Sequence, residues 1–326
     1  MIWGLGSLEL RVFKTLCSEP QGDYGKSMAS HLGLKESAVS RALTALAGKK
    51  LVVLERSGKR KLAVVSDASH ALALKAFFVA CPHVDAGVLA HSSIRVLSGL
   101  LFPNASVARV RRVGFLREIT VRRVLSKLLD AGVVGRRSAN DYYILLPLLQ
   151  KAVEEYVSFA VMQSKQDVNG SLISRGPYGF IRTGAEKVPS FMTPTGLSVL
   201  SEFGVKVIQT DFEDYYYNVF GSVKRPCLEE AIVHALLRST LLPSAREASY
   251  ALLALHKNKK KVSEEKFFVV AGDLGVEGAA RQSLEFVDAF AAGHEIKHSV
   301  GDDFLRVQGP VFPGFEEFKE LIAQYG

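Results

Sequence analysis

Two short segments combine hydroxyl and cationic side chains at helical spacing, which suits contacts with nucleic acid. One predicted helix carries four such residues on its exposed side: Ser37, Ser40, Arg41 and Thr44. A second carries three cations: Arg122, Arg123 and Lys127. Serine and threonine hydroxyls bond phosphates or base edges, and arginine reaches guanine in the major groove. We therefore predict that both helices face double-stranded DNA, with a merely solvated charged face as the alternative.

The helices that carry these residues belong to an internal repeat. Residues 10–16 (Leu-Arg-Val-Phe-Lys-Thr-Leu) return at 94–100 (Ile-Arg-Val-Leu-Ser-Gly-Leu), and residues 39–46 return at 121–128. The offset between the copies is 84 residues for the first of these segments and 82 for the second. Each copy predicts helix, helix, tight turn, helix and a short strand pair, which is the order of a winged helix-turn-helix. We therefore expect two tandem winged helices.

In the first copy, apolar residues at helical spacing predict helices over 7–17, 26–32 and 36–47. Gly33 suits a left-handed end of the second helix. The third helix has an apolar stripe that we expect to be buried: Val39, Ala42, Leu43 and Leu46. Strands over 52–55 and 61–65 enclose a basic tip whose cations we expect on the phosphate backbone: Arg56, Lys59, Arg60 and Lys61.

The second copy, over residues 91–146, is more basic. Four further cations lie near its turn, and we also expect them at the DNA: Arg109, Arg111, Arg112 and Arg117. The stripe expected to be buried is Val121, Val124, Leu125 and Leu128. Its wing, over 133–137 and 142–145, presents Arg136 and Arg137. A predicted helix over 67–80 links the copies. Two such modules can read two half-sites without a homodimer, although the sequence does not set their spacing.

The first copy resembles the winged-helix domains of MarR-like prokaryotic regulators. The resemblance lies in residues 28–34 (Met-Ala-Ser-His-Leu-Gly-Leu) and 37–43 (Ser-Ala-Val-Ser-Arg-Ala-Leu), followed by Leu46 and Leu51-Val52. It implies a DNA-binding regulator. Such sequences usually place Ser or Thr where this chain has Lys35, a departure that costs about 1 kcal/mol of helix capping.

The charge distribution agrees with a nucleic-acid-binding first half. Residues 1–146 hold 22 Lys and Arg against 10 Asp and Glu, a net charge of +12, whereas the remainder holds 19 against 23, a net charge of −4. Cys17, Cys81 and Cys227 have neither disulfide-framework nor zinc spacing, which favours a reducing cytoplasm. No signal peptide is read, and the most apolar run, 71–80, is too short to span a bilayer.

A polar break at 165–170 sets the second of two predicted domain boundaries. We expect an α+β chain: two tandem winged helix-turn-helix domains over 1–82 and 83–164, then a mixed α/β domain over 165–326. In that last domain the patterns predict strands over 172–174, 178–183, 205–210 and 267–270, and a helix over 194–203 ending at Gly204. We expect Tyr215–Tyr217 to form a strand that packs alternate rings into a core.

No catalytic, cofactor-binding or metal-binding constellation is found, so we do not expect an enzyme. Gly221-Ser222 lacks the paired aspartates of nucleotidyltransferases, and residues 272–275 lack a phosphate-binding Gly-rich loop with its lysine. Four histidines are scattered without metal-ligand spacing, and we expect each on the surface or in a loop: His234, His256, His294 and His298. The basic run 257–261 is expected to be a solvated loop.

The last domain is similar to the C-terminal domain of AbiEi-type antitoxins over about 60–80 residues. The similarity lies in residues 225–232 (Arg-Pro-Cys-Leu-Glu-Glu-Ala-Ile), Leu252-Leu253 and 279–284 (Ala-Ala-Arg-Gln-Ser-Leu). It implies an autoregulator of a toxin operon, with a toxin-like protein as partner of this domain. That family usually has one winged helix, so the second copy is a departure.

The sequence thus predicts a transcription regulator that binds double-stranded DNA and acts by occlusion or recruitment at a promoter, without covalent chemistry. The alternative is a protein-interaction scaffold whose winged helices dock a partner in a transcription or replication assembly. The two differ in salt dependence, because phosphate contacts are strongly salt-dependent and docking through apolar faces is not.

Overall fold

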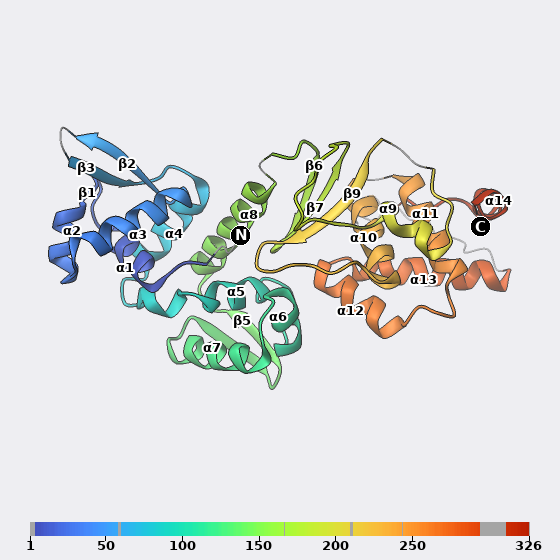
Figure 1. The fold of residues 1–326 in the computed structure, drawn as a ribbon. Coiled ribbons are helices and arrows are strands. Elements are labelled where there is room, and N and C mark those ends of the chain that lie inside the picture. Colours follow the sequence, from blue (N-terminus) through green and yellow to red (C-terminus); the bar gives the residue numbers. More distant parts are fainter. Residues whose placement is uncertain are drawn as a thin grey trace, which may run out of the picture. The chain divides into compact units, whose positions relative to one another are not determined.

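The computed structural model describes residues 4–57, 60–165, 167–208, 211–242, 244–293 and 311–325. Within those ranges the chain is an α+β protein with 14 α-helices and three small antiparallel sheets (Figure 1). It falls into two compact units: residues 1–164 with 219–221, and residues 165–218 with 222–326. Both sequence copies lie in the first unit.

The first copy forms helices close to the predicted ranges, and the Gly33 end of the second helix is confirmed. Its elements are α1 (Ser7–Cys17), β1 (Asp23–Tyr24), α2 (Gly25–Leu32), α3 (Glu36–Gly48), β2 (Val52–Ser57), β3 (Arg60–Val65) and α4 (Ser69–Ala80). The strands form an antiparallel sheet in the order β1-β3-β2. The four residues of the predicted α3 stripe are at most 5% exposed, so α3 packs its apolar side inward.

The second copy repeats this order. Its elements are η1 (Ala86–Leu89), α5 (Ser92–Gly99), α6 (Val107–Val113), α7 (Glu118–Asp130), β4 (Val134–Ser138), β5 (Asp141–Ile144) and α8 (Pro147–Ser164). A single antiparallel β-bridge between Ala105 and Tyr142 occupies the position at which β1 pairs with β3 in the first copy. The predicted α7 stripe is at most 7% exposed. In both copies the helices followed by a hairpin are compatible with a winged helix.

The backbone shows the repeat more sharply than the side chains do. Three pairs of residues 82 positions apart adopt positive φ angles: Gly22 and Asn104 (84° and 54°), Gly33 and Phe115 (64° and 51°), and Lys50 and Gly132 (52° and 66°). Only glycine adopts this conformation without steric cost. Each pair contains one glycine and one other residue. The turns of the two copies therefore have the same shape although their residues differ.

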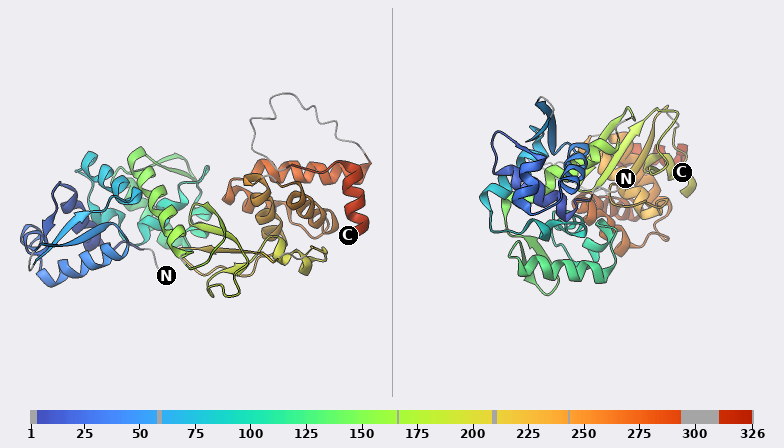
Figure 2. Two further views of the ribbon diagram at one scale, coloured as in Figure 1. Left: turned by 90° about the horizontal axis from the view of Figure 1, so that it is seen from above. Right: turned by 60° about the vertical axis from the view of Figure 1, so that its left-hand side comes forward.

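The second unit combines a four-stranded sheet with a cluster of helices (Figure 2). Its elements are β6 (Ser171–Arg175), β7 (Tyr178–Thr183), β8 (Thr193–Pro194), α9 (Leu197–Leu200), η2 (Ser201–Phe203), β9 (Glu213–Asn218), α10 (Leu228–Leu241), α11 (Ala245–Lys257), α12 (Glu264–Leu274), α13 (Glu277–Ala292) and α14 (Phe315–Tyr325). The sheet order is β6-β7-β9-β8, and all pairs are antiparallel.

Two predicted strands of this unit are wrong. Residues 205–208 form no strand, and residues 209 and 210 lie outside the described ranges. Residues 267–270 lie inside α12. The Phe-Phe-Val-Val run has the composition of a strand, but Ser263 caps the helix start and Gly275, at φ 71°, ends it. The predicted Tyr215–Tyr217 strand is confirmed as β9, although two adjacent rings, Tyr216 and Tyr217, are both buried.

The expectation of a surface position for His234 is also wrong, because His234 is buried in α10 against the sheet. Its ring centroid lies 4.9 Å from that of Phe180 and 4.8 Å from that of Tyr216. Thr195 Oγ1 lies 2.5 Å from its Nδ1. Burial lowers the pKa of His234 to about 3. His256 is partly buried against Phe290 and Phe318, and His294 and His298 lie outside the described ranges.

The matched turns predict different responses to two alanine substitutions. Gly132→Ala should lower the free energy of unfolding by about 1 kcal/mol, because a side chain at φ 66° is strained. Gly48→Ala is the control, since a Cβ there also meets open space but the backbone is helical. It should leave stability unchanged or raise it by up to about 1 kcal/mol. Urea denaturation measures both, and equal changes would contradict the strain argument.

The neutral, buried His234 predicts a loss of stability in acid. Its folded pKa of about 3 lies below the ordinary value of 6.5, so protons bind preferentially to the unfolded chain. The stabilisation is complete above pH 6.5 and is lost as the pH falls towards 3. Between pH 7 and pH 5 the loss from this group is about 2 kcal/mol. Denaturation of the wild type and of His234→Gln at both pH values measures it, and identical pH slopes would contradict it.

Candidate nucleic-acid interface

The polar side of α3 is exposed as the sequence predicts. Ser37, Ser40, Arg41 and Thr44 all face solvent. Arg41 Nε lies 3.4 Å from the Ser37 carbonyl oxygen, and the Thr44 hydroxyl donates to the Ser40 carbonyl at 3.0 Å. The hydroxyl of Thr44 therefore remains available chiefly as an acceptor. Lys35 occupies the N-cap and provides no side-chain capping bond, so the amides at the start of α3 lack that partner.

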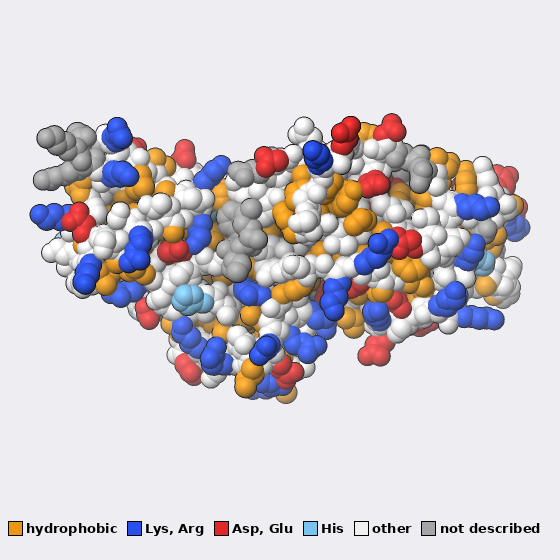
Figure 3. Space-filling view, viewed as in Figure 1, with side chains coloured by type: hydrophobic (Ala, Val, Ile, Leu, Met, Phe, Trp, Pro, Cys, Tyr) orange, Lys and Arg blue, Asp and Glu red, His pale blue; other side chains and the backbone are white. Residues whose placement is uncertain are grey.

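The polar side of α7 presents the three predicted cations. Arg122 pairs with Glu118 at 2.7 Å, and both side chains are more than half exposed. Lys127 Nζ donates to the Gly87 carbonyl of η1 at 2.7 Å. Arg123 is exposed. Figure 3 shows Lys and Arg side chains over α3 and again over α6 and α7 on one face of this unit.

One predicted contact residue is wrong. Arg109 is only 8% exposed, and its guanidinium donates to the carbonyl of Pro103 within the same copy. It therefore anchors the segment before α6 rather than facing solvent. Arg111 and Arg117 are exposed, and Arg112 is partly exposed. Sequence spacing does not separate Arg109 from Arg111 and Arg112, because a seven-residue helix gives too few turns to define its inner side.

Arg95, which no sequence pattern singled out, holds the turn before α7. Arg95 of α5 donates from Nε to the Gly114 carbonyl at 2.7 Å and from Nη2 to the Phe115 carbonyl at 2.5 Å. Burial lowers the pKa of this guanidinium. These bonds hold Phe115 in the left-handed conformation that Gly33 adopts freely in the first copy. Arg95 thereby positions the start of α7.

The first hairpin brings two of its predicted cations together. Arg56 and Lys61 are cross-strand partners, and both side chains are exposed. Arg60 pairs with Ser57 in the same ladder. Lys59 and the side chain of Arg60 lie outside what the structure describes. Neighbouring cations on one side of a hairpin suit a phosphate backbone.

The second hairpin holds its arginines on tyrosine rings. The Arg136 guanidinium carbon lies 5.6 Å from the Tyr142 ring centroid, and that of Arg137 lies 4.7 Å from Tyr143. Arg136 Nε also donates to the Ser138 carbonyl at 2.8 Å. Tyr143 packs over Gly135, where an added Cβ would lie 2.6 Å from the ring. Both arginines are thus exposed and partly ordered.

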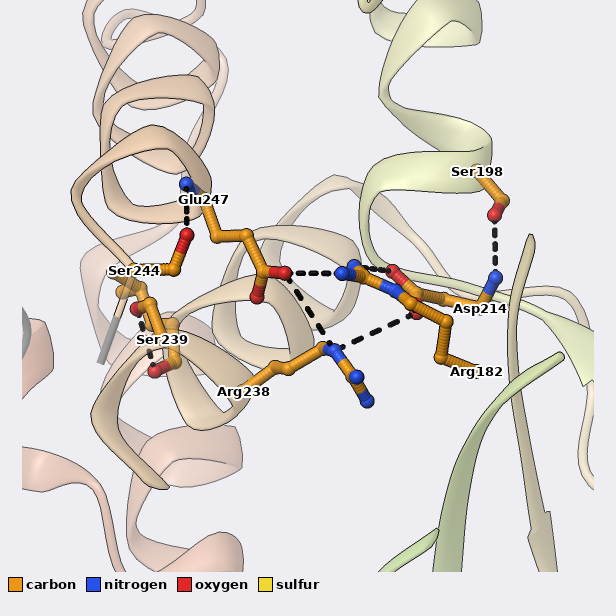
Figure 4. Close-up of polar contacts among 8 residues, drawn as sticks. Arg182, Ser198, Asp214, Arg238, Ser239, Ser244 and Glu247 are labelled. Atoms are coloured by element: carbon orange, nitrogen blue, oxygen red, sulfur yellow. Dashed lines mark hydrogen bonds and ion pairs between the residues drawn. The ribbon is translucent and has the colours of Figure 1, made fainter. Parts of the chain in front are cut away.

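The second unit contains a different cluster of charges, between the sheet and the helices (Figure 4). Arg182 of β7 donates two hydrogen bonds to its cross-strand partner Asp214, at 2.7 and 2.8 Å, and also bonds Glu247 of α11. Arg238 Nε lies 3.9 Å from Asp214 Oδ1 and 3.6 Å from Glu247 Oε1. We call these four residues the charge cluster. It joins both central strands to two helices.

The charge cluster has equal numbers of both signs and is mostly shielded from water. Its side chains are between 9% and 23% exposed. Burial lowers the pKa of Arg182, but bonds and charges of Asp214 and Glu247 outweigh it and raise the pKa above its ordinary value. Burial and then the charge of Arg182 lower the pKa of Arg238. A cavity of about 580 Å³ lies beside the cluster, with Phe212, Tyr250 and Arg246 also in its wall.

Neither unit presents a metal site or a membrane-crossing helix in its described residues. No three His, Cys, Asp or Glu side chains there are grouped to hold a metal ion. No described helix combines the length and apolarity needed to cross a bilayer. Comparison of the chain with known protein families and with curated protein sequences finds no match.

The charge cluster predicts a strong dependence of stability on Arg182. Arg182→Leu should lower the free energy of unfolding by about 3 kcal/mol, because it leaves two buried carboxylates without their main partner. Arg182→Lys should lose less, since it keeps the charge but not the paired hydrogen bonds. The control is Lys319→Ala, which removes an exposed pair with Glu316 and should leave unfolding unchanged. Chemical denaturation measures the free energy of unfolding of all three variants. An Arg182→Leu variant as stable as the wild type would contradict the role given to the charge cluster.

Proposed function

We propose that the chain is a transcription regulator that binds double-stranded DNA through two winged helices. In this proposal α3 and α7 enter the major groove, and the two hairpins contact phosphates. One observation carries the proposal: the same 13-residue third helix occurs twice, 82 residues apart, with its apolar stripe buried and its hydroxyl or cationic side exposed.

The electrostatics of the first unit support this proposal. Its sequence carries the whole basic excess of the chain. Arg111, Arg117 and Arg123 form no ion pair within the described residues, so their charges are available to phosphates. The shielded charges of the charge cluster are paired, whereas these three cations are exposed and form no ion pair within the described residues. Binding of a polyanion to this surface lowers the electrostatic repulsion between its exposed cations.

An exposed apolar residue also fits a groove. Ile119 in the first turn of α7 is 76% exposed, one helical turn from Arg122 and Arg123. The methyl group of thymine lies in the major groove and accepts apolar contacts, which an exposed isoleucine can make. The first turn of α7 would thus read bases while its cations bond guanine or phosphate.

We assign the second unit to regulation or to contact with a protein partner, with promoter occlusion or recruitment as the mode of action. Its cavity of about 580 Å³ has the size of a small-molecule site. The antitoxin-like role stays a prediction from the resemblance in this unit.

The alternative function is a protein-interaction scaffold. Ile119 and Phe115, which is 38% exposed, favour it, because a partner protein could cover both. Binding through these two residues would depend weakly on salt, whereas DNA binding through six or more phosphates would depend on it strongly.

The proposal predicts that Arg122→Ala combined with Arg123→Ala weakens DNA binding and flattens its salt dependence. The wild-type logarithmic salt slope for random duplex DNA should be about −5 or steeper, and the double variant should lose about two units of it. Fluorescence anisotropy between about 50 and 300 mM salt measures both slopes. The thermal melt should not change, because the Arg122–Glu118 pair is exposed.

A matched control removes two exposed lysines from the second unit, Lys187→Ala with Lys206→Ala. This control should bind DNA with the wild-type slope. Unaltered affinity in the Arg122 and Arg123 variant would refute the groove assignment of α7. A flat wild-type titration would refute DNA binding as a whole and favour the scaffold.

A further inference from the structure

The two copies are locked to each other by buried contacts. Helices α4 and α8, which follow the two hairpins, pack side by side. The His70 ring of α4 stacks on the Phe159 ring of α8, with centroids 3.7 Å apart and planes 11° apart. His70 Nε2 also lies 3.0 Å from the Lys49 carbonyl at the end of α3. This stacked pair, with the packing of α4 against α8, holds the two copies together.

Three further hydrogen bonds join the copies at their edges. Lys14 of α1 donates to the carbonyls of Pro82 and Val84 at 2.7 and 2.8 Å. The His91 amide donates to the Leu5 carbonyl at 2.7 Å. The segment between α4 and α5 is therefore bonded along its length to the start of the chain. It does not behave as a flexible linker, whose ends would be its only attachments.

The exposed sides of α3 and α7 border one continuous strip of surface. A groove of about 570 Å³ is lined by Arg41 of α3, Ser7 of α1 and His91. Ser7 contacts η1, because a Cβ on Gly87 would lie 3.3 Å from its Oγ. The Gly87 carbonyl in turn accepts the bond from Lys127 of α7. The residues Arg41, Ser7, Gly87 and Lys127, which mark this strip, all lie within one compact unit.

We propose that the two copies read one DNA duplex at the same time as a rigid pair, at a single spacing between half-sites. The phosphodiester backbone between the half-sites would cross the strip next to Arg41 and Lys127. This inference rests on the proposed function and adds to it that the protein, not a linker, sets the spacing. Binding of one copy places the second at its half-site, which multiplies the affinity without a homodimer.

Rigidity has a measurable consequence for DNA sequence. Each added base pair moves the half-sites apart by about 3.4 Å and turns them by about a tenth of a helical turn. A flexible tether would recover its affinity when a full turn is inserted, because the phase is restored. A rigid pair would not, because its recognition helices are held at one distance.

The experiment starts by selecting sites from a random duplex library with the full-length protein. The expected result is a site of two elements with one fixed spacing. Duplexes with 5 or 10 base pairs inserted between the elements are then compared by anisotropy. Both insertions should lower the affinity by at least about 100-fold, to the level of a duplex with one element.

A pair of protein variants identifies which copy reads which element. Arg41→Ala should weaken binding to the full site and to one single-element duplex only. Arg123→Ala should weaken binding to the full site and to the other single-element duplex only. Both substituted residues are exposed, so the fold should be preserved, and thermal melts check this.

Each outcome is decisive. One uninterrupted element, elements at several spacings, or recovery with the 10-base-pair insertion would overturn the rigid pair and leave DNA binding intact. Absence of any enriched site together with a flat salt titration would overturn the proposed function as well. Two elements at one spacing, together with weak binding to both duplexes that carry an insertion, would support the inference.

Discussion

The direction in which α3 and α7 present their polar sides depends on the burial of four apolar residues in each helix. Val39 and Leu46 in α3, and Val121 and Leu128 in α7, are fully buried. Burying such side chains contributes about 1.5–3 kcal/mol each, far more than the polar residues opposite could offset by turning inward. Rotating either helix would expose the stripe and bury arginines. The exposed side of each helix is therefore fixed by its buried side.

The two copies preserve a backbone more strictly than they preserve side chains. The turn before the third helix takes the left-handed conformation in both, with glycine in one and Phe115 in the other. Phe115 is held there by Arg95, whose counterpart in the first copy, Arg11, is exposed. The exposed sides have diverged as well, from hydroxyls in α3 to arginines in α7. Under the proposed function, two copies with the same backbone and different exposed sides would read two different DNA sequences.

Charge is used in opposite ways in the two units. In the second unit the charges of Arg182, Asp214 and Glu247 are shielded, so each must be paired, and pairing joins strands to helices. In the first unit most cations are exposed, where pairing contributes little to stability. Their charge is left for a ligand.

The sequence by itself determined the repeat, the buried stripes of α3 and α7 and the ranges of α1 and α3, because helical periodicity over 11–13 residues leaves one solution. It did not determine α12, where a strand-like run of Phe and Val was overridden by caps at Ser263 and Gly275. Nor did it show that Arg109 and His234 are buried. Whether one polar residue in a cluster points inward is decided by contacts with residues distant in sequence. Only the tertiary structure supplies those contacts, and only it joins the two copies into one unit.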